Sequence, residues 1–244
     1  MPGSLSIADL IANGTLSAEQ AATLWAVVEE QRSFIVVAIP RFAGKSTTMD
    51  AVLGLLSTDV PVHRLSGDEA EMDRLKQQAT GGYLVVGEFS EAAPSHYIWG
   101  APVRRVFDTL TAGYSLATAL HAPSLDEAFD AICQGNGASD EAASRIDFML
   151  YIRRFGDDEH TFWRRLAEIH EVDSVSGGRP SGRLLHRWDE AADRFDAVEP
   201  ARSLKTAAAD LASRASLLRE LVTSGRTSPP DVAQMVADYR PSPT

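Results

Sequence analysis

The sequence has little cysteine and no long apolar run. Its 244 residues contain a single cysteine, Cys133, so the chain cannot form an internal disulfide, which favours a reducing compartment. No apolar run approaches the ~20 residues that a membrane-spanning helix needs. The residues after Met1 also lack the charged-then-apolar pattern of a secretory signal. We therefore expect a soluble cytoplasmic protein.

Positive charge is also scarce. The chain has 23 Lys and Arg against 34 Asp and Glu, which gives a formal net charge of −11. This acidity argues against nucleic acid as a general partner, because the phosphate backbone attracts basic surfaces. Basic residues do gather locally, which leaves a local anion site open, in three pairs: Arg104-Arg105, Arg153-Arg154 and Arg164-Arg165.

One stretch, residues 34–48, combines an apolar run with a Gly-Lys-Ser-Thr string. Residues 34–38 suit a buried parallel strand, and apolar residues then recur at helical spacing after Thr48. Strand, turn, Gly44-Lys45-Ser46 and helix follow one another in the layout of a phosphate-binding loop. In such a loop, Lys45 would reach the β- and γ-phosphates and Ser46 would bind Mg²⁺.

The loop departs from the usual pattern at two positions. Ile39 stands where the first glycine is expected, and Phe42 stands where many such loops carry another. Glycine reaches backbone conformations that bulky residues avoid, so these changes bear directly on phosphate binding. The alternative interpretation is an ordinary helix start with Ser46 near the cap.

Polar side chains follow other predicted strands. We expect strands over residues 60–65, 83–88 and 115–120, with Glu88 and His121 at the ends of the last two. Ligands of α/β folds bind at the carboxyl ends of the strands. There, Glu88 could hold Mg²⁺ through water or activate the attacking water, and His121 could contact a γ-phosphate. A capping carboxylate and a structural histidine are the alternatives.

The last hundred residues have a different sequence pattern. Residues 146–154, 163–172, 183–188 and 194–198 look like strands joined by short turns, and two helical patterns follow. The predicted fold class is therefore α/β, with a mainly parallel sheet continued by antiparallel strands and C-terminal helices. We divide the chain into a helical lead-in (1–33), a core (34–200) and a C-terminal helical segment (201–244).

Three motifs occur in one order: Ala43-Gly44-Lys45-Ser46-Thr47-Thr48, Val85-Val86-Gly87-Glu88 and Ala119-Leu120-His121-Ala122. Together they resemble the type II/type IV secretion and pilus-assembly motor ATPases, closest to the tight-adherence and type IV secretion branch. The resemblance implies a RecA-like P-loop core over 34–200, with ATP and Mg²⁺ as cofactors. It also implies a homo-oligomer, a hexamer in that family, peripheral at the inner membrane beside a platform protein.

The resemblance assigns roles to residues by position. Ala43, Gly44, Lys45, Ser46 and Thr47 would form the nucleotide-binding loop, with Thr47 supporting the loop or contacting the α-phosphate. Ser46 and Glu88 would hold Mg²⁺ and its water shell.

Three residues are the catalytic candidates: Glu88, Glu71 and His121, which would sense the γ-phosphate. Glu71 comes from the family's acidic box. Aligning that box on Asp68 and Glu71 puts Gly67 where the family has its catalytic glutamate, so Glu69 or Glu71 would have to substitute for it.

Two functions follow from these observations. The first is an ATP-binding, ATP-hydrolysing motor of a pilus or secretion system. The alternative is a degenerate relative with little or no hydrolysis that acts as a regulatory or interaction module, which Ile39, Phe42 and Gly67 favour. A small-molecule kinase is a weaker interpretation because no Arg-rich lid is visible, and the net acidity opposes a DNA translocase.

Overall fold

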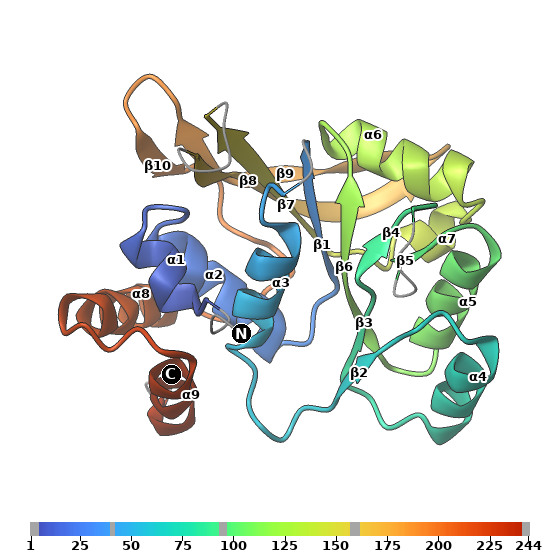
Figure 1. The fold of residues 1–244 in the computed structure, drawn as a ribbon, viewed down its shortest axis with the longest axis horizontal. Coiled ribbons are helices and arrows are strands. Elements are labelled where there is room, and N and C mark those ends of the chain that lie inside the picture. Colours follow the sequence, from blue (N-terminus) through green and yellow to red (C-terminus); the bar gives the residue numbers. More distant parts are fainter. Residues whose placement is uncertain (1–4, 40–41, 93–96, 157–161, 241–244) are drawn as a thin grey trace.

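The computed structural model describes residues 5–39, 42–92, 97–156 and 162–240. In this part of the chain, ten strands form one sheet at the centre of the fold (Figure 1). The strands lie in the order β10-β9-β8-β7-β1-β6-β3-β2, and β4 pairs with β6 and β5. Pairing is parallel from β7 through β1 and β6 to β2, and antiparallel from β7 to β10. This confirms the predicted parallel sheet with its antiparallel continuation.

The strands have these bounds: β1 Phe34–Ile39, β2 Val62–Arg64, β3 Tyr83–Val85, β4 Glu88–Phe89, β5 Tyr97–Ile98, β6 Ser115–His121, β7 Phe148–Phe155, β8 Trp163–Ser176, β9 Arg179–Asp189 and β10 Arg194–Ala197. The helices are α1 Ile7–Ala12, α2 Ala18–Glu29, α3 Lys45–Leu53, α4 Glu69–Gln78, α5 Ala101–Leu110, α6 Leu125–Asp130, the π-helical turn η1 Ala131–Gly135, α7 Asp140–Ala143, α8 Ala208–Thr223 and α9 Pro229–Asp238.

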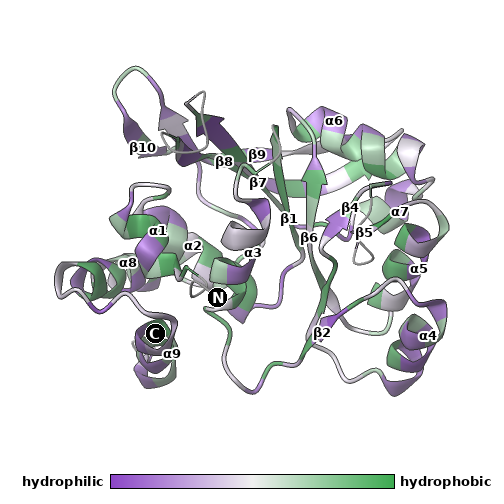
Figure 2. Ribbon diagram, in the orientation of Figure 1, coloured by the Kyte–Doolittle hydropathy of each residue, from purple (hydrophilic) through white to green (hydrophobic). Residues whose placement is uncertain are grey.

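Helices cover both faces of the sheet. One core lies between the sheet and helices α1, α2, α3, α8 and α9, and the other lies beneath α4 to α7. Strand β1 supplies both cores, because Val36 and Ala38 face the first while Ile35 and Val37 face the second. Figure 2 shows the apolar character of β1 and β6 against the polar surface helix α4. A strand buried on both faces explains the unbroken apolar run in the sequence.

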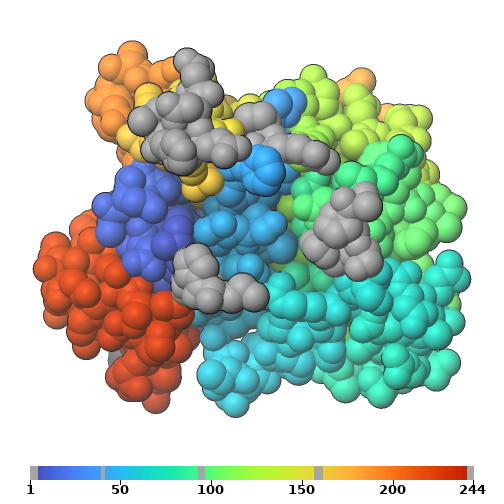
Figure 3. Space-filling model, in the orientation of Figure 1, coloured from blue at the N-terminus to red at the C-terminus, as the bar shows by residue number. Residues whose placement is uncertain are grey.

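The two ends of the described chain lie together. Helix α8 packs on α2 and α1, and Figure 3 shows the α8–α9 segment beside the N-terminal helices. The Glu30 carboxylate accepts hydrogen bonds from the backbone N–H groups of Lys205 and Thr206. The buried carboxylate of Glu171 does the same for Arg202 and Ser203. Two acids in the sheet layer and its lead-in helix therefore fix the path into α8.

Strand 83–88 was predicted as one continuous strand, and this is wrong in detail. The structure has two short strands that both pair with β6, Val85 opposite Ala117 and Phe89 opposite Leu120. Four steps along one strand thus face three steps along β6, which is the geometry of a β-bulge. The irregularity re-aims the chain just before Glu88.

The acids at 68–71 could belong to a solvated loop or face a metal–phosphate complex, and in the structure they form the start of α4. The Asp68 carboxylate accepts a hydrogen bond from the Ala70 N–H, and Glu69 and Glu71 occupy the first helical turn. Negative charges are favourable there because the helix N-terminus carries partial positive charge.

Candidate nucleotide site

The loop between β1 and α3 has two residues in the left-handed backbone region. Gly44, which precedes α3, has φ +93°, and Phe42 has φ +63°. Glycine adopts this region freely, whereas a side-chain-bearing residue does so at a cost of about 1–2 kcal/mol. Phe42 therefore has a backbone conformation typical of glycine, and the residue is 80% exposed rather than filling the loop. Pro40 and Arg41 lie outside the described residues.

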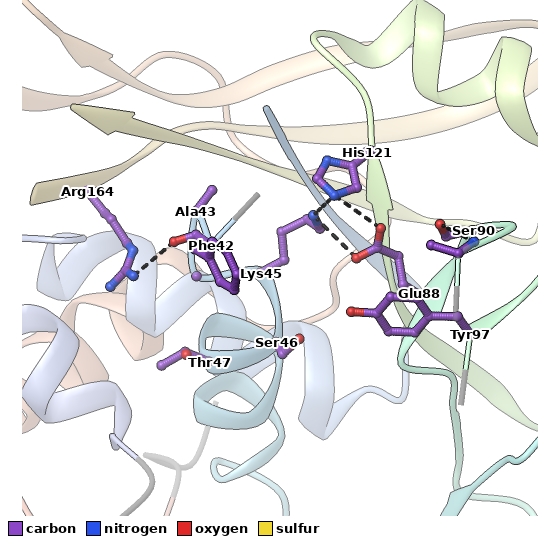
Figure 4. Close-up of a pocket in the computed structure, with 12 residues that line it drawn as sticks. Phe42, Ala43, Lys45, Ser46, Thr47, Glu88, Ser90, Tyr97, His121 and Arg164 are labelled. Atoms are coloured by element: carbon purple, nitrogen blue, oxygen red, sulfur yellow. Dashed lines mark hydrogen bonds and ion pairs between the residues drawn. The ribbon is translucent and has the colours of Figure 1, made fainter. Parts of the chain in front are cut away.

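Lys45, Glu88 and His121 meet above this loop (Figure 4). The Lys45 Nζ atom lies 3.3 Å from Glu88 Oε2 and 3.1 Å from His121 Nε2. Lys45 begins α3 after the carboxyl end of β1, Glu88 follows the carboxyl end of β3 as the first residue of β4, and His121 ends β6. The carboxyl ends of neighbouring parallel strands meet at one edge of a sheet, so the topology itself brings these groups together.

The pair at the centre of this cluster is buried. Lys45 is 7% exposed and Glu88 is 4% exposed, whereas His121 lies at the outer end of the group. Glu88 Oε1 is 3.3 Å from His121 Nε2 but has no hydrogen-bond partner among the described residues. A buried carboxylate oxygen without a partner is costly, so Glu88 has capacity to accept a further ligand.

The cluster lies in a cavity of about 460 Å³. The cavity is lined by Phe42, Ala43, Gly44, Lys45, Ser46, Thr47, Glu88, Ser90, Ala92, Tyr97, His121 and Arg164. The five predicted loop residues, 43–47, all lie on it, as do Glu88 and His121. Ala43 is buried and Ser46 is exposed.

Glu71 does not line the cavity. Its Oε2 atom accepts hydrogen bonds from the Ser66 N–H and hydroxyl, both at 3.3 Å, and so stabilises the turn before α4. Gly67 lies in that turn at φ +90°, and a β-carbon there would come within 2.6 Å of Ile98 Cγ2. Packing against Ile98 thus explains why position 67 is a glycine. The catalytic role of Glu71 stays a prediction.

Sequence reasoning left four lining residues outside the site: Ser90, Ala92, Tyr97 and Arg164. For Arg164 a signal existed, because the Arg164-Arg165 pair indicates a local anion site. Nothing in the local sequence placed that pair beside the loop.

The donor set fits a magnesium ion carried by phosphates. No group of three or more His, Cys, Asp or Glu side chains among the described residues forms a metal site. Mg²⁺ bound with a nucleotide needs only one or two protein oxygens, since phosphates and water supply the rest. Ser46 and Glu88 both line the cavity, and the Ser46 hydroxyl and Glu88 Oε1, which accepts no hydrogen bond among the described residues, meet that need.

Comparison with solved structures gives partial matches. The chain is similar to the VirB11 ATPase of the Brucella suis type IV secretion system, solved in complex with sulphate, at 13% identity and a TM-score of 0.45, over 63% of this chain and 52% of that one. It is similar to the Legionella pneumophila ATPase DotB at 12% identity and a TM-score of 0.41, over 85% of this chain and 58% of that one. The chain thus spans little more than half of each protein. No protein-family model matches it, and no curated protein does.

In the part of the chain that the structure describes, no helix combines the length and the apolar character that crossing a membrane requires.

Proposed function

We propose that the cavity binds ATP with Mg²⁺ and that the protein is a motor-type ATPase of a pilus or of a type II/IV secretion system. One observation carries this proposal: the Lys45 ammonium, at the start of α3, meets Glu88 and His121 from two neighbouring strand ends. A cation over a helix N-terminus, with an acid and an imidazole beside it, suits a bound phosphate chain and the water that attacks it.

The chain's own residues would divide the work. In the structure, Lys45 is held by Glu88 and His121, so phosphate oxygens must compete with that ion pair. Once Lys45 turns to the phosphates, Glu88 is released to orient water, and His121 stays within reach of the terminal phosphate. Bound Mg²⁺ would neutralise phosphate charge, held by Ser46 and by Glu88 through its water shell.

Binding and turnover test the proposal together. Calorimetric titration of the intact chain with ATP·Mg²⁺ should show one site, and phosphate release should follow. Lys45→Ala should lose both signals. Glu88→Gln should keep binding, because phosphate oxygens then no longer compete with the Lys45–Glu88 ion pair, and should lose turnover. Lys76→Ala is the matched control, since Lys76 pairs with Asp108 on the surface. Loss of binding in Lys76→Ala, or unchanged binding in Lys45→Ala, contradicts the assignment of the site.

The second candidate is a nucleotide-binding relative that does not hydrolyse, acting as a regulatory or interaction module. The exposed Phe42 at a glycine position and the absence of Glu71 from the cavity favour it. Tight binding of ATP·Mg²⁺ without phosphate release would select this candidate, and sustained release would reject it.

The assembly and the location of the protein are part of the same proposal. By the resemblance, the active form is a homo-oligomer, a hexamer, that works in the cytoplasm at an inner-membrane platform protein. Light scattering of the wild type and of Glu88→Gln, with and without ATP·Mg²⁺, measures the oligomer directly. A monomer under all four conditions would contradict a hexameric motor.

A further inference from the structure

Arg164, at the start of β8, lies across the phosphate loop (Figure 4). Its Nη2 atom donates a hydrogen bond to the Phe42 carbonyl at 3.0 Å. Its stem lies so near Gly44 that a β-carbon at that position would come within 2.9 Å of Arg164 Cδ and Nε. Arg164 therefore covers the loop from the β8 side, although it lies 122 residues further along the chain than Phe42.

A second arginine, Arg154, lies next to Arg164 and repels its positive charge. Arg154 and Arg164 lie opposite each other on β7 and β8, and the Phe162 ring is 4.7 Å from the first guanidinium and 4.5 Å from the second. The aromatic ring attracts both cations. Burial, with Arg154 nearby, lowers the pKa of the Arg164 guanidinium. Such a site gains from a nearby anion, because an anion would offset both the burial and the repulsion.

The Arg164 guanidinium also has unused hydrogen-bonding capacity. Its Nε atom is buried and has no hydrogen-bond partner among the described residues. The neighbouring Arg165 differs, because its Nε and Nη2 both donate to the Asp193 carboxylate at 3.0 Å. One member of the Arg164-Arg165 pair is thus satisfied by an acid, and the other faces the cavity.

We propose that Arg164 is a second cation for the nucleotide, which binds the phosphates nearer to the nucleoside on the side of the loop away from Glu88 and His121. A guanidinium fork matches two phosphate oxygens at once, which suits this task. This inference rests on the proposed function of the same cavity. It assigns the inner phosphates to Arg164, while the terminal phosphate belongs to His121.

The test is calorimetric titration of the intact chain with ATP·Mg²⁺ and with ADP·Mg²⁺. Loss of a charge-assisted contact predicts that Arg164→Ala weakens binding of both nucleotides by the same factor, roughly 10- to 100-fold. His121→Ala should weaken binding of ATP relative to ADP. Arg165→Gln is the matched control from the same strand and should bind both nucleotides like the wild type. Thermal unfolding of each variant confirms that it is folded.

Arg164→Gln separates phosphate binding from mere support of the loop. Glutamine keeps an amide N–H donor on a shorter side chain, but it carries no charge. If Arg164 binds phosphate, Arg164→Gln is as weak as Arg164→Ala. Wild-type affinity in Arg164→Gln overturns the inference, as does an equal loss in Arg165→Gln. If the wild type binds no nucleotide, the proposed function fails and this inference fails with it; wild-type binding with an unaffected Arg164→Ala overturns the Arg164 assignment alone.

Discussion

Removing one charge of the Lys45–Glu88 pair should destabilise the protein more than removing both. The two groups lie 3.3 Å apart and are almost fully buried. At an effective dielectric constant of about 20, that separation corresponds to an attraction of about 5 kcal/mol. Breaking a buried pair costs about 3–5 kcal/mol because the remaining charge is left without compensation. The cavity admits water, so we expect the lower end, about 3 kcal/mol, for each single variant.

The double variant should recover most of that loss. Replacing both partners by neutral groups of similar size leaves no buried charge, and such replacements are often nearly neutral. For Lys45→Met with Glu88→Gln we expect a loss of about 1 kcal/mol, which gives a coupling energy of about 5 kcal/mol between the two sites. Urea unfolding of the wild type, the two single variants and the double variant measures all the terms of this cycle.

The matched control is the exposed pair Arg64–Asp50, whose charged atoms lie 2.8 Å apart. Exposed pairs of this kind contribute about 0–1 kcal/mol, so the same cycle there should show little coupling. If the Lys45–Glu88 cycle also gives less than about 1 kcal/mol, burial does not strengthen this pair and the reasoning about the resting state of the site is refuted.

Three further perturbations follow from other parts of the structure. Burial lowers the pKa of His186 from 6.5 to about 4, so its contribution to stability is complete above pH 6.5 and is lost as the pH falls towards 4. In urea unfolding, His186→Gln should therefore reduce the loss of stability at acidic pH by about 2–3 kcal/mol. An unchanged pH dependence in this variant would contradict the prediction. Phe42→Gly should raise the unfolding free energy by at most about 1 kcal/mol, because glycine adopts the left-handed backbone conformation without strain. Ile39→Gly should lower it by about 1 kcal/mol. An equal loss of stability in both variants would disprove strain at Phe42. Glu171→Gln removes the charge that holds the start of the C-terminal segment and should cost about 3 kcal/mol by thermal or urea unfolding, with a loss below about 0.5 kcal/mol as the contrary result.

Much of the fold could be predicted because its signals are local. The apolar run of β1 and the antiparallel strands after residue 145 follow from patterns a few residues long. The Ser17 and Ser228 caps are equally local, since each hydroxyl accepts a hydrogen bond from the N–H three residues later. Cys133 is buried, and burial raises the pKa of its thiol.

The errors arose where a neighbouring element decided the local structure. Strand 83–88 reads as one apolar run, but its pairing with β6 introduces a bulge that separates Val85 from Glu88. The acids at 68–71 look like a solvated loop, yet they begin a helix because Asp68 caps it and α5 packs against it. Side-chain pattern does not contain the register of a partner strand or the position of a packing helix.

The sequence by itself determined the order of the site: an apolar strand, a Gly-Lys-Ser turn and a helix, with Glu88 and His121 at later strand ends. Only the tertiary structure decided that Lys45 forms an ion pair with Glu88 and that the Arg164 side chain covers the loop. Lys45 and His121 are 76 residues apart in the chain, and Phe42 and Arg164 are 122 apart. Such contacts depend on which distant strands pair, and the side-chain pattern of a single strand does not specify its partner.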